Sequence, residues 1–141
     1  IHNVDILSNI DLPALYQQHL NNKSLATLVV SPRKTSRYLL FNEQYYLKGW
    51  LNKTTGELRP AGFTHPENYH KLAFAGIQVV SPEIFRLMEN RSGPFPIIDF
   101  YLSISETHTI HGLVPEGFQM IDVGKHNALS EAESFIANYS Q

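Results

Sequence analysis

Two aspartates near opposite ends of this sequence have the pattern best suited to chemistry. Asp5 and Asp122 each follow apolar residues at what should be the end of a strand, and we expect a break after each. We expect both to lie at the carboxyl ends of strands, the edge of an open α/β sheet where ligands bind. Carboxylates there could hold Mg²⁺, which proteins bind through one or two carboxylates and substrate phosphates. The alternative is that each aspartate caps the loop or helix that follows it.

Two further groups of polar residues could take part in chemistry, but their patterns favour simpler roles. Arg33, Lys34 and Arg37 form a basic cluster that could meet a phosphate, although a solvated loop is the better interpretation. His108 and His111 have the spacing of metal ligands. On a strand, however, their rings would point to opposite faces, so we do not expect them to share a metal.

The composition is that of a globular domain and excludes several functional classes. The 141 residues are 43% hydrophobic and 17% charged, so the chain can bury a core and is not disordered. A net charge of -2 argues against nucleic acid or an anionic membrane as the main partner. Without cysteine the sequence has no disulfide, zinc ribbon or thiol nucleophile. We expect one soluble, cytoplasmic domain over residues 1–141, with no membrane span.

The elements that must position these residues follow from the periodicity of the sequence. Apolar runs predict a buried strand over 25–30 and a long strand over 72–80. Residues 37–41 and 45–51 should pair as a hairpin, whereas 57–70 has no regular pattern. A helix over 12–22, capped by Asp11, is predicted from an apolar face at helical spacing, formed by Leu12, Leu15, Tyr16, His19 and Leu20.

The second half of the chain predicts alternating helices and strands. Ser81 should cap a helix that ends at Met88, and a helix should cover 97–104. On the second helix Asp99 could reach the site or simply cap or pair, and we give it no catalytic role. Residues 107–114 alternate as an edge strand, and 118–123 form a last short strand. The final helix runs from Asn127 to Tyr139, with an inward face formed by Leu129, Ala132, Phe135 and Ile136. This order indicates an α/β sheet with helices on its faces.

Five segments occur in an order that resembles one enzyme family. They are residues 2–7 (HNVDIL), 33–41 (RKTSRYLLF), 72–77 (LAFAGI), 97–102 (IIDFYL) and 121–125 (IDVGK). Over nearly the whole chain they resemble the C-terminal part of the sugar-phosphate nucleotidyltransferases. The nearest groups are the mannose-1-phosphate guanylyltransferase-like and N-acetylmuramate-1-phosphate uridylyltransferase-like enzymes. The resemblance implies a Rossmann-like nucleotide-diphospho-sugar transferase fold, a mixed sheet flanked by helices, here without its N-terminal nucleotide-binding portion.

The resemblance also implies roles for particular residues. Asp5 and Asp122 would hold Mg²⁺, and Gly76 would lie where a larger side chain would fill space that the sugar needs. A β-bulge is the alternative at Gly76. Where this chain departs from many relatives, Asn52 could bond a sugar hydroxyl and Trp50 could form an apolar wall for a sugar face. The alternatives are that Asn52 closes a turn and that Trp50 packs in the core. These residues therefore do not identify the sugar.

The implied reaction transfers a nucleotidyl group from a nucleoside triphosphate to a sugar 1-phosphate and releases pyrophosphate. Residues 1–141 contain no Gly-x-Gly and no Gly-x-x-x-x-Gly-Lys loop, elements that the family carries ahead of the strand with Asp5. We therefore expect this chain, which opens part-way through a strand, to be the sugar-binding and metal-completing part of an enzyme and inactive alone. The alternatives are a non-catalytic, regulatory relative that binds a nucleotide sugar, and a small binding domain with coincidental similarity. An open sheet edge would favour a homo-oligomer.

Overall fold

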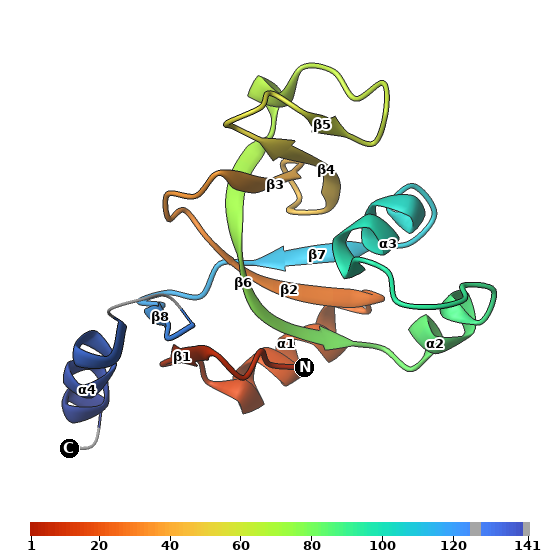
Figure 1. The fold of residues 1–141 in the computed structure, drawn as a ribbon. Coiled ribbons are helices and arrows are strands. Elements are labelled where there is room, and N and C mark those ends of the chain that lie inside the picture. The colour runs from red at the N-terminus through yellow and green to blue at the C-terminus, as the bar shows by residue number, and fades with distance from the viewer. Residues whose placement is uncertain (125–127, 140–141) are drawn as a thin grey trace.

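The computed structural model describes residues 1–124 and 128–139. Along them the elements are β1 (Ile6–Ser8), α1 (Leu12–Asn22), β2 (Ala26–Ser31), β3 (Arg37–Phe41), β4 (Leu47–Asn52), β5 (Leu58–Arg59), η1 (Pro66–Asn68), β6 (His70–Val80), α2 (Glu83–Met88), α3 (Ile97–Ile104), β7 (Ile110–Leu113), β8 (Met120–Asp122) and α4 (Ala128–Tyr139) (Figure 1). The predicted helices and strands are present, with ends that differ by a few residues. Asn127, the predicted start of the last helix, lies outside the described residues. No helix within the described ranges has the length and apolar character needed to cross a bilayer.

Six strands form one mixed sheet in the order β5–β4–β3–β6–β2–β7. β2 pairs antiparallel with β6 and parallel with β7. Helices cover both faces of β2, because Leu28 packs into the cluster that contains Phe100 of α3, and Val29 packs with Leu15 of α1. Burial on both faces explains why β2 is apolar without alternation. The predicted α/β sheet with flanking helices is confirmed at this level.

Residues 1–3 lie beside the C-terminal half of β6 and antiparallel to it, so they run in the same direction as β2 and β7. The backbone N–H of Asn3 donates to the carbonyl oxygen of Gly76 at 3.0 Å, and His2 forms a bridge with Ile77. The chain then turns at Asp5 and leaves β6. The predicted strand end is therefore right for residues 1–3, and Asp5 lies in the turn just beyond it.

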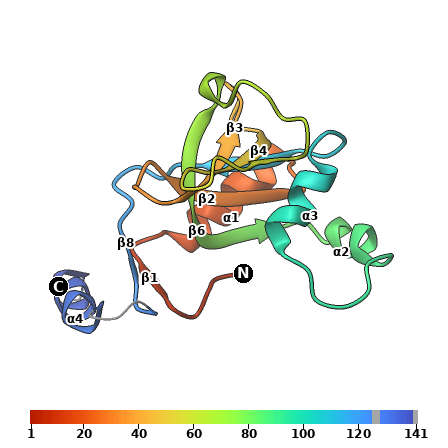
Figure 2. The same ribbon diagram turned by 45° about the horizontal axis from the view of Figure 1, so that its top comes forward.

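β1 and β8 form a separate two-stranded antiparallel ribbon that joins the two ends of the chain. Ile6 pairs with Asp122, and Ser8 pairs with Met120. The strand predicted at 118–123 therefore belongs to this ribbon and not to the main sheet. α4 follows the ribbon and stands away from α2 and α3 in both views (Figure 1 and Figure 2).

The turn between β3 and β4 reaches across to the far strand of the main sheet. The backbone N–H of Gly112 in β7 donates to the carbonyl oxygen of Tyr45 at 2.8 Å, and Tyr46 forms a bridge with His111. The sheet therefore curls until the β3–β4 turn meets β7. β4 of this hairpin lies against α3.

Three predicted details of the helices are wrong. Of the five residues predicted to face inward from α1, Leu12, Tyr16 and Leu20 are about half exposed, because this surface helix buries a narrow stripe only. Ser81 does not cap α2; its hydroxyl instead donates to the carbonyl oxygen of Ser24. In α4 Ala132 is buried as predicted but Ile136 is exposed, and the side chain of Leu129 lies outside the described residues.

Candidate functional site

Asp5 and Asp122 lie side by side at one end of the β1–β8 ribbon. Asp122 is the last residue of β8 and pairs with Ile6, the residue directly after Asp5. The backbone N–H of Val123 donates to the carbonyl oxygen of Asp5 at 2.8 Å. Antiparallel pairing sets the beginning of one strand beside the end of the other, so the ribbon brings the two aspartates together. We name this pair, with Gly124, the carboxylate corner.

Gly124 leaves space between the two carboxylates. A Cβ on Gly124 would lie 3.0 Å from Oδ2 of Asp5 and 3.3 Å from Oδ1 of Asp122. Oδ1 of Asp122 also accepts the backbone N–H of Gly124 at 3.2 Å, so the capping role left open for Asp122 is present too. Carboxylate oxygens converging on one small space are hard ligands of the kind that Mg²⁺ prefers.

The carboxylate corner supplies only part of a metal's coordination sphere. Across the part of the chain that the structure describes, no group of three or more His, Cys, Asp or Glu side chains is arranged to hold a metal. A cation held by Asp5 and Asp122 would therefore take its remaining ligands from phosphate or water oxygens. Mg²⁺ is commonly bound in this way at sites that handle substrate phosphates.

The second candidate site is a pocket between the β3–β4–β5 strands and α3, which we name the arginine pocket. Its volume is about 340 Å³, within the range of small-molecule sites. Its lining combines charged with aromatic side chains, among them Arg33, Arg37, Trp50, Arg59, Phe74 and Asp99. Three arginines and one carboxylate give the lining a cationic excess, which suits an anionic ligand.

Arg59 of β5 is held by three neighbours. Its Nε donates to Oε1 of Glu57 and its Nη1 donates to Oδ1 of Asp99, both at 2.8 Å. Its Cζ lies 4.4 Å from the centroid of the Trp50 ring, a cation–π contact. The hydrogen bonds with Glu57 and Asp99 raise the pKa of Arg59 above its ordinary value. Although its side chain is 41% exposed, Arg59 therefore has a defined position at the pocket wall.

Arg33 and Arg37 form another part of the pocket wall. Nη2 of Arg33 donates to the carbonyl oxygen of Phe74 at 3.0 Å. Its Nε is buried and has no hydrogen-bond partner within the described ranges. Arg37, at the start of β3, is exposed, and so is Lys34, which does not line the pocket. The solvated loop favoured from the sequence is therefore right for Lys34, whereas the two arginines lie at the pocket.

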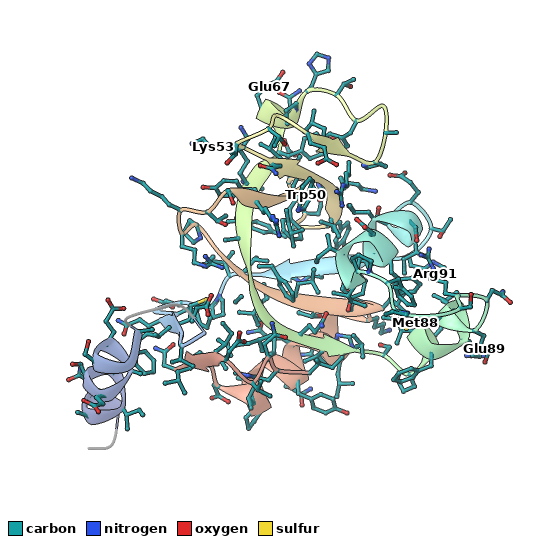
Figure 3. The ribbon with its side chains drawn as sticks, viewed as in Figure 1. Trp50, Lys53, Glu67, Met88, Glu89 and Arg91 are labelled. Carbon is teal, nitrogen blue, oxygen red and sulfur yellow. The ribbon has the colours of Figure 1, made fainter. Side chains whose placement is uncertain are left out.

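Trp50 and Asn52 have the structural roles that were left open beside their substrate roles. Trp50 is 9% exposed and belongs to the main core cluster, while Arg59 covers one face of its ring. Figure 3 shows Trp50 inside the molecule, on the side of β4 toward α3. Oδ1 of Asn52 accepts the backbone N–H groups of Thr54 and Thr55 at 3.0 and 3.3 Å, so its side chain closes a turn. Trp50 lines the arginine pocket, and Asn52 does not.

Gly76 lies at a bulge in β6. Its φ is +75°, and the pairing of β2 with β6 changes register beside it, between Leu28 and Val30. A Cβ at Gly76 would lie 2.7 Å from Nδ2 of Asn3. The bulge and the packing of Asn3 therefore account for glycine here, whether or not a ligand also approaches.

β6 links the two candidate sites. One edge of β6 pairs with β2. The other edge pairs first with β3, at residues 70–72, and then with residues 1–3, at residues 76–78. Near Phe74 segment 1–3 and β3 diverge from one another. Asp5 follows segment 1–3, and Arg37 is the first residue of β3. Arg33, just beyond the end of β2, bonds to Phe74 at this point. Both sites therefore face the carboxyl ends of the parallel segments 1–3 and β2.

His108 and His111 do not form a shared site. Nδ1 of His108 lies 2.9 Å from Oγ1 of Thr107, whereas Nδ1 of His111 lies 3.3 Å from Nδ2 of Asn22. His111 also meets the ring of Tyr46 edge to face. Each imidazole thus has its own partners. His108 lies before β7 and only His111 lies on it, so the strand predicted over 107–114 is shorter than expected.

Sequence reasoning missed Arg59, and for Asp99 it left open a place at the site, a cap or an ion pair, without a catalytic role. Arg59 stands in a segment without regular pattern, and no local motif marks it. Its pairing with Asp99 joins β5 to α3 across 40 positions of sequence, so only the folded chain reveals it. The only local sign in the sequence was that Arg59 is a lone cation among turn-forming residues.

A scan against models of known protein families found none that matches this chain, and a search of curated proteins found no match either. The function is therefore inferred from the two candidate sites and their relation to the fold.

Proposed function

We propose that this chain forms the sugar-binding and metal-holding part of a Mg²⁺-dependent sugar-1-phosphate nucleotidyltransferase. The observation that carries the proposal is the carboxylate corner, where Asp5 and Asp122 both approach the space beside Gly124. Their types, their order in the sequence and the position of Asp5 beyond the end of segment 1–3, which runs parallel to β2, agree with the family resemblance. The finer fold assignment, a Rossmann-like nucleotide-diphospho-sugar transferase domain, is part of the same proposal.

The arginine pocket supports a phosphorylated sugar as the ligand. Arg33 and Arg37 offer two cations for a phosphate dianion, and they lie on the side of the pocket where β6 leads to the carboxylate corner. Arg59 and Asp99 lie on the side of β5 and α3 and offer a donor and an acceptor for hydroxyl groups. The phosphate would thus face the two aspartates, with the sugar ring toward Arg59.

The reaction needs positioning more than covalent help from the protein. An oxygen of the sugar 1-phosphate attacks the α-phosphorus of a nucleoside triphosphate, the bond from that phosphorus to the bridging oxygen breaks, and pyrophosphate leaves. In-line placement and neutralisation of phosphate charge supply most of the catalysis in such transfers. Arg33 and Arg37 would orient the attacking phosphate. Mg²⁺ on Asp5 and Asp122 would offset negative charge on the phosphate oxygens.

Two measurements test the proposal. Mn²⁺ added as a paramagnetic substitute for Mg²⁺ should broaden the amide resonances of Ile6, Val123 and Gly124 first, and excess Mg²⁺ should reverse this. Asp5→Asn and Asp122→Asn should abolish the effect, while Glu116→Gln, an exposed carboxylate beyond the other end of the ribbon, should leave it intact. In the product of the natural gene, the same Asp variants should lose pyrophosphate release from nucleoside triphosphate and sugar 1-phosphate. Broadening elsewhere, or turnover that survives either Asp variant, contradicts the metal assignment.

A second candidate function is that of a non-catalytic relative, which would bind a nucleotide sugar at the arginine pocket and the carboxylate corner without turning it over. Binding of sugar phosphate and Mn²⁺ by the natural gene product, with no pyrophosphate released from any nucleoside triphosphate, would favour this alternative.

A further inference from the structure

The charges around the arginine pocket point to the kind of sugar that it accepts. We propose that the triad of Arg59, Asp99 and Glu57, here named the Arg59 triad, selects neutral sugar 1-phosphates and rejects those that carry a carboxylate. The inference rests on the proposed function and narrows it. Of the two enzyme groups that the sequence resembles, it favours a neutral hexose substrate over N-acetylmuramate 1-phosphate, whose lactyl group is an acid.

The phosphate group would use the cations that are available in the pocket. Arg33 and Arg37 have no carboxylate partner in any ion pair within the described residues. A sugar 1-phosphate carries about two negative charges at neutral pH, so these two arginines would balance it. Lys34 does not line the pocket. A second anionic group on the sugar would therefore have only Arg59 to meet.

Arg59 is already shared between two carboxylates. Glu57 and Asp99 each accept one of its hydrogen bonds at 2.8 Å, so the triad as a whole carries one net negative charge. The guanidinium face that lies over Trp50 is also occupied. Asp99 lines the pocket and Glu57 bonds to Arg59 from outside the lining, so a carboxylate on the sugar would approach two negative charges held at one guanidinium. Like charges at a binding site oppose association.

A hydroxyl group, in contrast, fits the Arg59 triad well. Asp99 lines the pocket, and a carboxylate has acceptor positions beyond the one that Arg59 fills. A sugar hydroxyl can donate to Asp99 and accept from Arg59, whereas a carboxylate can only accept. Neutral hexoses present such hydroxyls, so the same triad that repels an acid has the donor and acceptor to hold a polyol.

The test compares sugar 1-phosphates that differ only in the acid. Calorimetric titration of the 141-residue chain with Mg²⁺ present should use glucose 1-phosphate against glucuronate 1-phosphate, and N-acetylglucosamine 1-phosphate against N-acetylmuramate 1-phosphate. We expect the neutral member of each pair to bind about tenfold more tightly at low salt, with a smaller ratio at high salt. Equal binding, or tighter binding of the acids, overturns the inference and leaves the proposed function standing. Failure of all four compounds to bind overturns both.

Variants of the triad separate charge selection from a loss of folding. Asp99→Asn removes one negative charge with little change of shape, so the preference for the neutral sugar should fall about fivefold. Glu57→Gln should act in the same direction but less strongly, since Glu57 does not line the pocket. Glu89→Gln is the control, because Glu89 lies at α2, far from Trp50 in Figure 3. An unchanged ratio in Asp99→Asn with an unchanged circular dichroism spectrum would contradict the assignment.

Discussion

The carboxylate corner and the arginine pocket are assembled in different ways. The corner depends on a single strand pairing, in which Ile6 and Asp122 face one another and Gly124 leaves room beside them. The pocket draws side chains from β3, β4, β5, β6 and α3, and its wall includes Trp50, a residue of the main core. Substitutions at the corner should therefore remove its metal-binding groups with little loss of stability. Substitutions in the pocket wall should also destabilise the fold. The following predictions test this contrast.

The largest effect is expected at the corner. Asp5→Asn or Asp122→Asn should lower turnover in the natural gene product at least about a thousandfold, since each removes one of two metal ligands. The double variant should be hardly worse than either single one, because the two act as a unit. Stability should change by only about 0.5 kcal/mol, as is usual for surface positions. A pyrophosphate-release assay measures the turnover, and urea denaturation measures the stability. A large loss of stability would mean that the corner belongs to the core of the fold.

Trp50→Ala should mainly lower stability, whereas the aspartate variants should mainly lower turnover. It empties a buried aromatic site and removes the cation–π partner of Arg59, so the free energy of unfolding should fall by about 3 kcal/mol. Trp50→Phe keeps an aromatic ring, so its free energy of unfolding should fall clearly less. Denaturant midpoints of the two variants decide the matter. A Trp50→Ala protein as stable as the parent would mean that the pocket wall is independent of the core.

Gly76→Ala should destabilise by about 2 kcal/mol, from the strain of a positive φ and from the close approach of Asn3. Adding Asn3→Ala should restore the part due to the contact but not the part due to φ. A double-mutant cycle by denaturant unfolding separates the two. If the second substitution recovers nothing, Asn3 is not what requires glycine at this bulge.

Arg37→Gln should weaken the binding of a sugar 1-phosphate about tenfold, because one charge-assisted contact is lost. Lys34→Gln is the matched control, since Lys34 belongs to the same basic cluster but does not line the pocket. Calorimetry at low and high salt should show a weaker salt dependence for Arg37→Gln alone. Equal losses in both variants would mean that the cluster acts only as a diffuse positive charge.

The smallest effect concerns pH. Burial lowers the pKa of His19 and of His111 below the ordinary value of 6.5. As the pH falls below 6.5, the unfolded chain binds protons that these imidazoles resist in the folded state, so stability should decline. His19→Gln should reduce the decline between about pH 7.5 and about pH 5.5. Urea midpoints across this range measure it, and a slope unchanged by the substitution would assign the effect to other groups.

The sequence was most informative where local pattern decides structure. The capping side chain of Asp11 accepts the backbone N–H of Ala14, as the cap motif predicted. The run over 25–30, apolar except for Thr27, is buried throughout, as predicted for a strand there. The family resemblance, not a local pattern, implied that Asp5 and Asp122 share a site, and the antiparallel ribbon that sets them side by side was not predicted. That ribbon and the Arg59–Asp99 pair are long-range contacts, set by register and by packing between distant elements. No spacing within the sequence encodes them directly.

The contact of the β3–β4 turn with β7 has a consequence for how copies of this molecule meet. Without this contact the outer edge of β7 would expose unpaired backbone N–H and C=O groups. A strand of another molecule could pair with them, which is a common route to aggregation. Tyr45 and Tyr46 occupy that edge through the bond to Gly112 and the bridge to His111. A neighbouring molecule cannot extend the sheet there without first displacing the turn. Self-association by strand addition at β7 is thereby opposed by the chain's own hairpin.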